Sequence, residues 1–146
     1  MQYKEIKQDL FTLTDDYHLL NYLSADFNYI DSTAQKINET YDIQHKLLTK
    51  YPSYPSYWTN NCIIGDCILE GKVFNLVVME HISDKVTVRA LLVALLRCKQ
   101  ICLEKDICKL AISKSNKELS SIRWESVLNV LNEVFDGTNI EILICT

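Results

Sequence analysis

The stretch Val73–Ile112, VFNLVVMEHISDKVTVRALLVALLRCKQICLEKDICKLAI, decides the fold. Its first seven residues are a nearly continuous apolar run, which is typical of a central strand buried on both faces. The segment Thr87–Glu104 then carries the strongest helical pattern of the chain, with leucines at helical spacing. Residues 107–112 form a second buried strand. Two buried strands separated by an amphipathic helix indicate a parallel pair covered by that helix.

The flanking sequence continues this alternation of strands and amphipathic helices. Strands are expected at 3–9, 18–24, 62–69, 72–79 and 140–145, with a hairpin turn at Glu70-Gly71, and helices at 32–41, 45–50 and 122–135, the last ended by Gly137. The pattern therefore predicts an α/β protein with three layers, α/β/α, around a mixed, mostly parallel sheet. At 146 residues, we expect residues 1–146 to form a single domain.

Composition and charge exclude several classes of function. The chain is 48% hydrophobic, enough for a sizeable core, and its net charge of −4 gives no general attraction to nucleic acid. No apolar run reaches the roughly 18 residues of a membrane span. It has three glycines, where average usage gives about ten. Glycine lets the backbone approach a phosphate closely, so phosphate-binding loops are disfavoured.

The six cysteines form no CxxC pair and have no histidines at zinc spacing. They are expected to be buried, reduced thiols, with no metal and no cofactor. Reduced thiols indicate an intracellular setting, cytoplasmic or nuclear. Abundant Ile, Lys and Asn with little Arg or Gly suggest a low-GC genome, viral or bacterial.

Five short stretches, in order along nearly the whole chain, match the pattern of a known family. They are Gln8-Asp-Leu-Phe11, His18-Leu-Leu-Asn-Tyr-Leu-Ser-Ala-Asp26, Leu110-Ala-Ile-Ser113, Ile122-Arg-Trp-Glu125 and Val134-Phe-Asp-Gly-Thr-Asn-Ile-Glu-Ile142. The chain resembles the macrodomain family, specifically the branch of the terminal ADP-ribose protein glycohydrolases. The resemblance implies an ADP-ribose cleft at the strand ends, with two glycine-rich loops around the diphosphate.

Both diphosphate loops depart from the family's pattern. Where the family reads Met-Gly-Ala-Gly-Ile-Ala, this chain reads Tyr29-Ile-Asp-Ser-Thr-Ala34. Where the family reads Gly-Cys-Gly-Leu-Asp, it reads Asn116-Lys-Glu-Leu-Ser120. The glycines are replaced, among others by Ser32 and Asn116, and Asp31 and Glu118 add carboxylates near the expected diphosphate. Lys114 and Lys117 can partly offset that repulsion. We therefore expect ADP-ribose binding to be lost.

The catalytic positions are also changed. The resemblance implies a nucleophilic lysine after the central strand and an acid–base aspartate in the second loop. By alignment these positions hold Met79 and Ser120, and neither side chain can perform the chemistry. No catalytic residue is therefore expected. An alternative is a displaced pair, Asp84 and Lys85, several ångströms from the required place.

The adenine end of the implied site is retained. Asp9 matches an aspartate that accepts a hydrogen bond from the adenine amino group, and Ser24 matches a serine near the distal ribose. Two plainer interpretations stay open: Asp9 can cap the turn that follows it, and Ser24 can be an ordinary residue at a strand end.

All eight tyrosines fall within the first 57 residues. A loop with a repeated Pro-Ser-Tyr unit carries Tyr51, Tyr54, Tyr57 and Trp58, and it either folds onto the domain or forms a contact surface. The sequence thus predicts a catalytically inactive macrodomain-like protein that acts in protein interaction or self-association. The alternatives are a module that binds ADP-ribose or another adenine nucleotide, and an active hydrolase with relocated residues.

Overall fold

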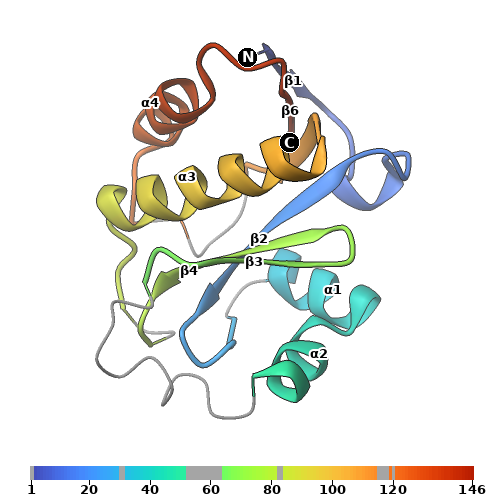
Figure 1. Ribbon diagram of the computed structural model, residues 1–146, viewed down its shortest axis with the longest axis vertical. Coiled ribbons are helices and arrows are strands. Elements are labelled where there is room, and N and C mark those ends of the chain that lie inside the picture. The colour runs from blue at the N-terminus through green and yellow to red at the C-terminus, as the bar shows by residue number, and fades with distance from the viewer. Residues whose placement is uncertain (1, 30–31, 52–63, 82–83, 115–118, 120) are drawn as a thin grey trace.

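The computed structural model describes all residues except 1, 30–31, 52–63, 82–83, 115–118 and 120 (Figure 1). The strands are β1 (Gln2–Ile6), β2 (His18–Ser24), β3 (Cys67–Glu70), β4 (Val73–Met79), β5 (Lys109–Ser113) and β6 (Glu141–Cys145). The helices are the 3-10 turn η1 (Leu10–Thr12), α1 (Ser32–Tyr41), α2 (Ile43–Lys50), α3 (Val88–Lys105) and α4 (Trp124–Phe135).

The six strands form one sheet in the order β1-β6-β5-β2-β4-β3. Among the described strands, β3 alone runs antiparallel, paired with β4 through the hairpin at Glu70-Gly71, and the other neighbouring pairs are parallel. This arrangement confirms the predicted mixed, mostly parallel sheet. It also brings the carboxyl ends of β1, β6, β5, β2 and β4 to one edge, where ligands bind in open α/β sheets.

Helices cover both faces of the sheet, with α3 and α4 on one side and α1 and α2 on the other (Figure 1). Alternate residues of β2 supply the two faces: Tyr22 packs toward α3 and α4, whereas Leu19 and Leu23 pack toward α1 and α2. All seven residues of β4 are buried, as the apolar run predicted. The three-layer α/β/α architecture is therefore confirmed.

Residues close in sequence determine where α3 begins and ends and where β3 begins. Thr87 caps α3 by accepting a hydrogen bond from the Ala90 N–H, and Asp106 ends the helix in the left-handed conformation. The strand expected from residue 62 begins only at Cys67. Gly65 has a φ of +101° and its N–H donates to the Val77 carbonyl, so the chain turns there before the hairpin pairs.

The described cysteines follow the predicted pattern except at one position. Four are buried free thiols, namely Cys67, Cys98, Cys102 and Cys145, but Cys108 is exposed. Cys108 precedes β5, before the strand enters the core, and its carbonyl accepts the Glu141 N–H. The expectation of burial is therefore wrong for Cys108, whereas Cys62 lies outside the described residues. No group of three metal-binding side chains occurs in the described part of the chain.

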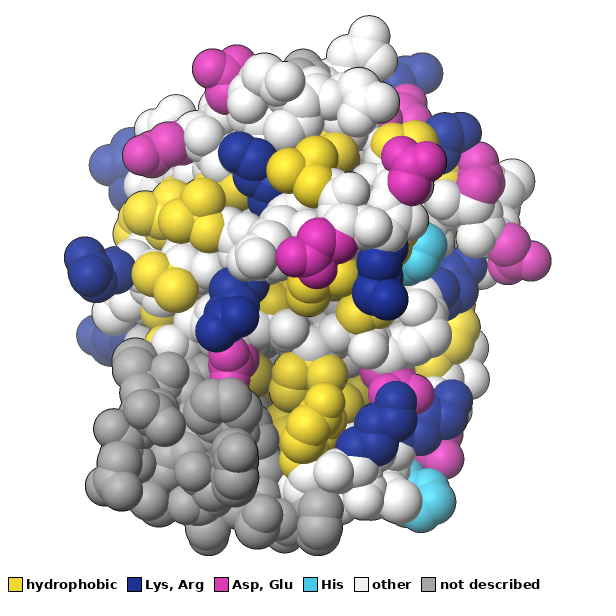
Figure 2. All heavy atoms as spheres, viewed as in Figure 1, with side chains coloured by type: hydrophobic (Ala, Val, Ile, Leu, Met, Phe, Trp, Pro, Cys, Tyr) yellow, Lys and Arg dark blue, Asp and Glu magenta, His cyan; other side chains and the backbone are white. Residues whose placement is uncertain are grey.

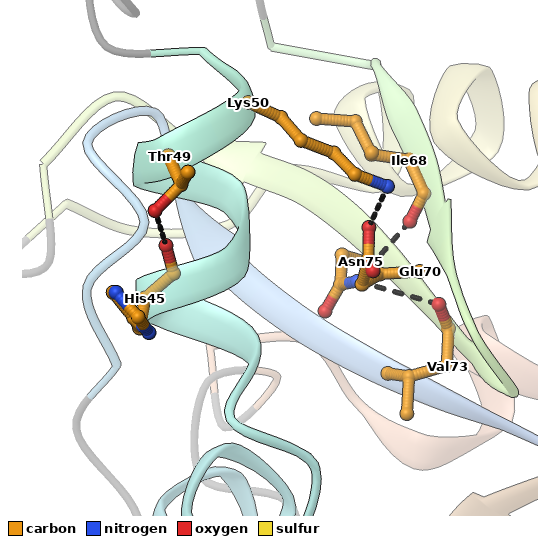
Figure 3. A network of polar contacts seen from close by, with 7 residues as sticks. All are labelled: His45, Thr49, Lys50, Ile68, Glu70, Val73 and Asn75. Atoms are coloured by element: carbon orange, nitrogen blue, oxygen red, sulfur yellow. Dashed lines mark hydrogen bonds and ion pairs between the residues drawn. The ribbon is translucent and has the colours of Figure 1, made fainter.

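A buried polar network holds the β3–β4 hairpin beneath α2. The Asn75 side-chain amide donates to the Ile68 and Val73 carbonyls at 3.1 and 3.3 Å and accepts from Asn21 at 3.0 Å. At the rim, Lys50 of α2 pairs with Glu70 of β3 (Figure 3). Asn75 thus bonds to backbone on both strands of the hairpin, while the ion pair ties the hairpin to α2.

His18 opens β2 with its imidazole half-buried, 5.7 Å from the ring of Phe74. Its Nδ1 is buried and has no hydrogen-bond partner in the described structure. Burial lowers the pKa of His18, and the charge of Lys72 lowers it further. The folded protein therefore keeps this ring neutral at pH values where the unfolded chain, with a pKa of about 6.5, takes up a proton.

We expect this difference in pKa to make stability depend on pH. The unfolded state binds more protons, so the free energy of unfolding falls as the pH drops below about 6.5. Urea unfolding at pH 7.5 and 5.5 measures the effect. His18→Gln is expected to reduce the dependence, and His81→Gln, an exposed site, serves as the control. An equal pH dependence in wild type and His18→Gln would contradict this assignment.

None of the helices in the described ranges is both long and apolar enough to cross a bilayer.

Candidate functional site

A cavity of about 320 Å³ opens at the carboxyl edge of the sheet, beside the ends of β1, β6 and β5. Strand ends, the η1 turn and the start of α1 form its wall. The lining residues are Gln8, Asp9, Leu10, Phe11, Thr33, Ser113, Cys145 and Thr146. The cavity therefore combines an acidic group, an aromatic ring and small hydroxyl and thiol side chains contributed by four separate parts of the chain.

Asp9 is the acidic group of this cavity. One carboxylate oxygen accepts the Phe11 N–H at 2.9 Å and so caps the η1 turn. The side chain is 54% exposed, which leaves the other oxygen accessible. The capping interpretation of Asp9 is confirmed, and its role toward adenine stays a prediction.

Lys36, from the first half of α1, lies against both Asp9 and Phe11. Its Nζ is 3.9 Å from the Asp9 carboxylate and 4.5 Å from the centre of the Phe11 ring. A cation in this position reduces the negative potential that Asp9 places at the cavity. Sequence analysis missed Lys36, although it follows Thr33 by one helical turn and thus lies on the same side of α1.

Cys145 ends β6 and lines the same cavity. Burial raises the pKa of the Cys145 thiol, and the nearby Asp9 carboxylate raises it further. The thiol is therefore protonated at neutral pH and is a poor nucleophile. Cys145 adds a small apolar surface to a largely polar cavity wall without contributing reactive chemistry.

Ser24 is fully buried at the end of β2, and its hydroxyl forms hydrogen bonds within the turn that follows the strand. The hydroxyl donates to the Asp26 carboxylate and accepts the Asn28 N–H at 3.0 Å. The β2–β4 register shifts between Leu23 and Ser24, and Phe27 adopts a left-handed conformation within the turn. The predicted contact of Ser24 with a ribose stays a prediction.

Met79 ends β4, where the resemblance implies a nucleophilic lysine. The Met79 side chain is 2% exposed and belongs to the core under α3, and its carbonyl accepts the Ala25 N–H at 2.9 Å. An apolar thioether packed in this way can neither attack carbon nor transfer a proton.

The diphosphate loops lie largely outside the described ranges. Asp31, Asn116, Glu118 and Ser120 fall there, and Ser32 is the first residue of α1. Lys114, one of the two lysines that could offset acidic charge, is bound elsewhere. Its Nζ is 2.9 Å from the Glu5 carboxylate and 5.4 Å from the centre of the Trp124 ring.

The remaining candidates are dispersed. Asp84 and Lys85 are exposed, and the Asp84 carboxylate accepts the His81 N–H within a turn. Tyr51 is 39% exposed at the end of α2. Tyr54, Tyr57 and Trp58 lie outside the described residues, so the tyrosine-rich contact surface stays a prediction.

No protein-family model and no curated protein matches the sequence, but solved structures do. The chain is similar to the macrodomain of Thermus aquaticus DarG, with 11% identity, a TM-score of 0.78 and coverage of 99% of this chain and 98% of that one. The macrodomain of Mycobacterium tuberculosis DarG is also similar, with 14% identity, a TM-score of 0.79 and coverage of 99% of this chain and 97% of that one. The structure of Thermosipho africanus DarTG in complex with ADP-ribose is similar with 10% identity and a TM-score of 0.68, and the match covers 98% of this chain and 41% of that one. The resemblance to the terminal ADP-ribose protein glycohydrolase branch stays a prediction.

Proposed function

Because the chain has the macrodomain fold, we propose that it is a macrodomain that has lost hydrolysis and tight binding of ADP-ribose and now acts as a protein-interaction module. Because likeness in fold alone does not determine function, the proposal rests on the residues at the implied site.

Met79 carries the proposal. The implied reaction needs an amine at the end of β4 that forms a Schiff base with the ribose. In this chain the position holds a thioether that is 2% exposed and packed in the core. The core under α3 is closed at this point, so a small shift of the substrate cannot restore the missing nucleophile.

The sequence of the diphosphate loops supports the same conclusion for binding. Asp31 and Glu118 replace parts of the family's glycine-containing loops with acids. A unit charge near another at about 4 Å costs about 1 to 4 kcal/mol, depending on screening. Backbone hydrogen bonds contribute about 1 kcal/mol each. Lys114 contacts Glu5 and the Trp124 ring, so it offsets little of the repulsion between these acids and a diphosphate.

The cavity beside Asp9 favours a second function, the binding of ADP-ribose or another adenine nucleotide. Its volume of about 320 Å³ falls at the lower end of ligand pockets, which span about 300–1,000 Å³. The accessible Asp9 oxygen can accept a hydrogen bond from an amino group, and Lys36 tempers the local negative charge.

Two measurements distinguish these functions. In calorimetric titration with ADP-ribose, we expect a dissociation constant weaker than about 10 μM, the equivalent of about 7 kcal/mol of binding free energy. With a protein carrying ADP-ribose on glutamate, we expect no release above the uncatalysed background, while an active macrodomain hydrolase serves as the positive control.

Tighter binding that Asp9→Asn weakens would replace the proposed function with the second one. Measurable release of ADP-ribose would contradict the loss of hydrolysis. In that case Lys85→Ala would test the displaced pair, because Lys85 is exposed and its removal should leave the fold intact.

A further inference from the structure

Helix α3 carries an apolar stripe on its exposed side. Val88, Leu96 and Leu103 are 45%, 46% and 58% exposed, and Leu92 is half-buried between them. Residues four or seven apart share one side of a helix, so these four side chains lie on one side of α3 and are here called the α3 stripe, with Lys99 between Leu96 and Leu103. At 1.5 Å per residue it is about 22 Å long.

The α3 stripe is not an ordinary solvent-facing helix surface. Four of the seven large hydrophobic side chains exposed in the described structure belong to α3. In Figure 2, hydrophobic side chains lie between Lys and Arg side chains along the path that α3 takes in Figure 1. A line of exposed apolar side chains bordered by charges is typical of a contact surface.

From this surface we infer that two copies of the chain associate through their α3 helices in antiparallel orientation. The inference rests on the proposed interaction function and identifies its partner as a second copy. A two-fold axis across the stripe would make the contact self-complementary and closed.

The apolar residues of the stripe match one another in that orientation. The register that sets Leu92 opposite Leu103 of the second copy also sets Val88 opposite Ile107, a half-buried residue just after α3. The same register sets Leu96 opposite Lys99, whose alkyl chain can cover a leucine while its ammonium group stays in water. Each apolar position therefore meets an apolar group.

The charges match in the same register. Arg89, at the start of α3, comes opposite Asp106, which follows its end. Both side chains are exposed, and neither takes part in an ion pair within the described residues. A parallel arrangement would place Arg89 beside Arg89 and Asp106 beside Asp106. Antiparallel helices also oppose their dipoles favourably.

The size of the contact predicts a weak dimer. One pair of helices of this length buries far less than the roughly 1,600 Å² of a standard interface. Sedimentation equilibrium of the full chain between about 5 and 500 μM should therefore show reversible association, with a dissociation constant in the range of about 10 to 100 μM. A monomer throughout that range would overturn the inference.

Substitutions in the stripe test its location. Leu103→Glu and, separately, Leu96→Glu are expected to weaken association at least about tenfold, since each buries a carboxylate in the contact. Leu48→Glu is the matched control, because Leu48 is 41% exposed on α2. Association that survives both α3 substitutions would overturn the inference.

A charge exchange tests the antiparallel register. Arg89→Asp alone places an aspartate opposite Asp106, and Asp106→Lys alone places a lysine opposite Arg89, so each variant should be monomeric. In an equal mixture of the two variants, the introduced aspartate faces the introduced lysine, and the unchanged Arg89 of one chain faces the unchanged Asp106 of the other. The mixture should therefore form a heterodimer. Failure of the mixture to associate, with both variants folded by circular dichroism, would overturn the register.

These outcomes are separate from those of the proposed function. If Tyr54→Ala with Trp58→Ala abolishes association while Leu103→Glu does not, the α3 inference fails and the interaction function stands. If the chain releases ADP-ribose from glutamate, the proposed function fails whatever the α3 variants do.

Discussion

Replacing Asn75 with alanine is expected to lower the free energy of unfolding by about 3 kcal/mol. The Asn75 amide donates to the Ile68 and Val73 carbonyls (Figure 3). Its oxygen accepts a hydrogen bond from the Asn21 side chain. Asn21 and Asn75 are both fully buried, so water cannot replace the lost partners. Urea unfolding of wild type and variant at pH 7.5 measures the difference.

Two further variants separate loss of hydrogen bonds from loss of volume. Asn129→Ala removes the same side chain from the exposed side of α4 and should change stability by less than about 0.5 kcal/mol. The double variant Asn21→Leu with Asn75→Leu removes both polar partners and fills the space, so it should cost less than Asn75→Ala. A double variant less stable than Asn75→Ala would show that packing, and not the polar network, dominates here.

Gly65→Ala is expected to destabilise the protein by about 3 kcal/mol, combining backbone strain with a steric overlap. Gly65 has a φ of +101°, which side chains rarely tolerate. A Cβ there would lie 2.7 Å from Val93 Cγ1 and 3.2 Å from Val93 Cβ. Thermal and urea unfolding measure the loss.

Gly71 and Val93 provide the controls for this substitution. Gly71 also has a positive φ, +59°, but a Cβ there meets nothing within 4 Å, so Gly71→Ala should cost only about 1 kcal/mol. Adding Val93→Ala to Gly65→Ala should recover the part of the loss caused by the overlap. If Gly65→Ala and Gly71→Ala cost the same, the overlap with Val93 makes no contribution.

The regular elements could be predicted because their signals are local. The helical spacing of leucines in α3 and the apolar run of β4 each persist through the element, so tertiary contacts did not override them. The late start of β3 could not be predicted, since it depends on the conformation of Gly65 and on its bond to Val77. The exposure of Cys108 likewise depends on where β5 enters the core.

The candidate site was only partly predictable, because it joins side chains that are distant in the sequence. Asp9 follows the first strand and is followed by Leu10 and Phe11, a short motif that sequence alone identifies. Lys36 reaches Asp9 and Phe11 only through the packing of α1. The turn that occupies the Ser24 hydroxyl begins where the register between β2 and β4 shifts, which no pattern of residue types reveals.

The order of strands has a consequence for how the protein is made. Among the described strands, the first, β1, pairs with the last, β6, and has no other neighbour in the sheet. During synthesis β1 leaves the ribosome before the other described strands, whereas its partner β6 is the last of them to emerge. Central strands β2 and β4 can pair much earlier. We therefore expect the nascent chain to assemble the sheet from its centre, with β1 unpaired until β6 has left the ribosome.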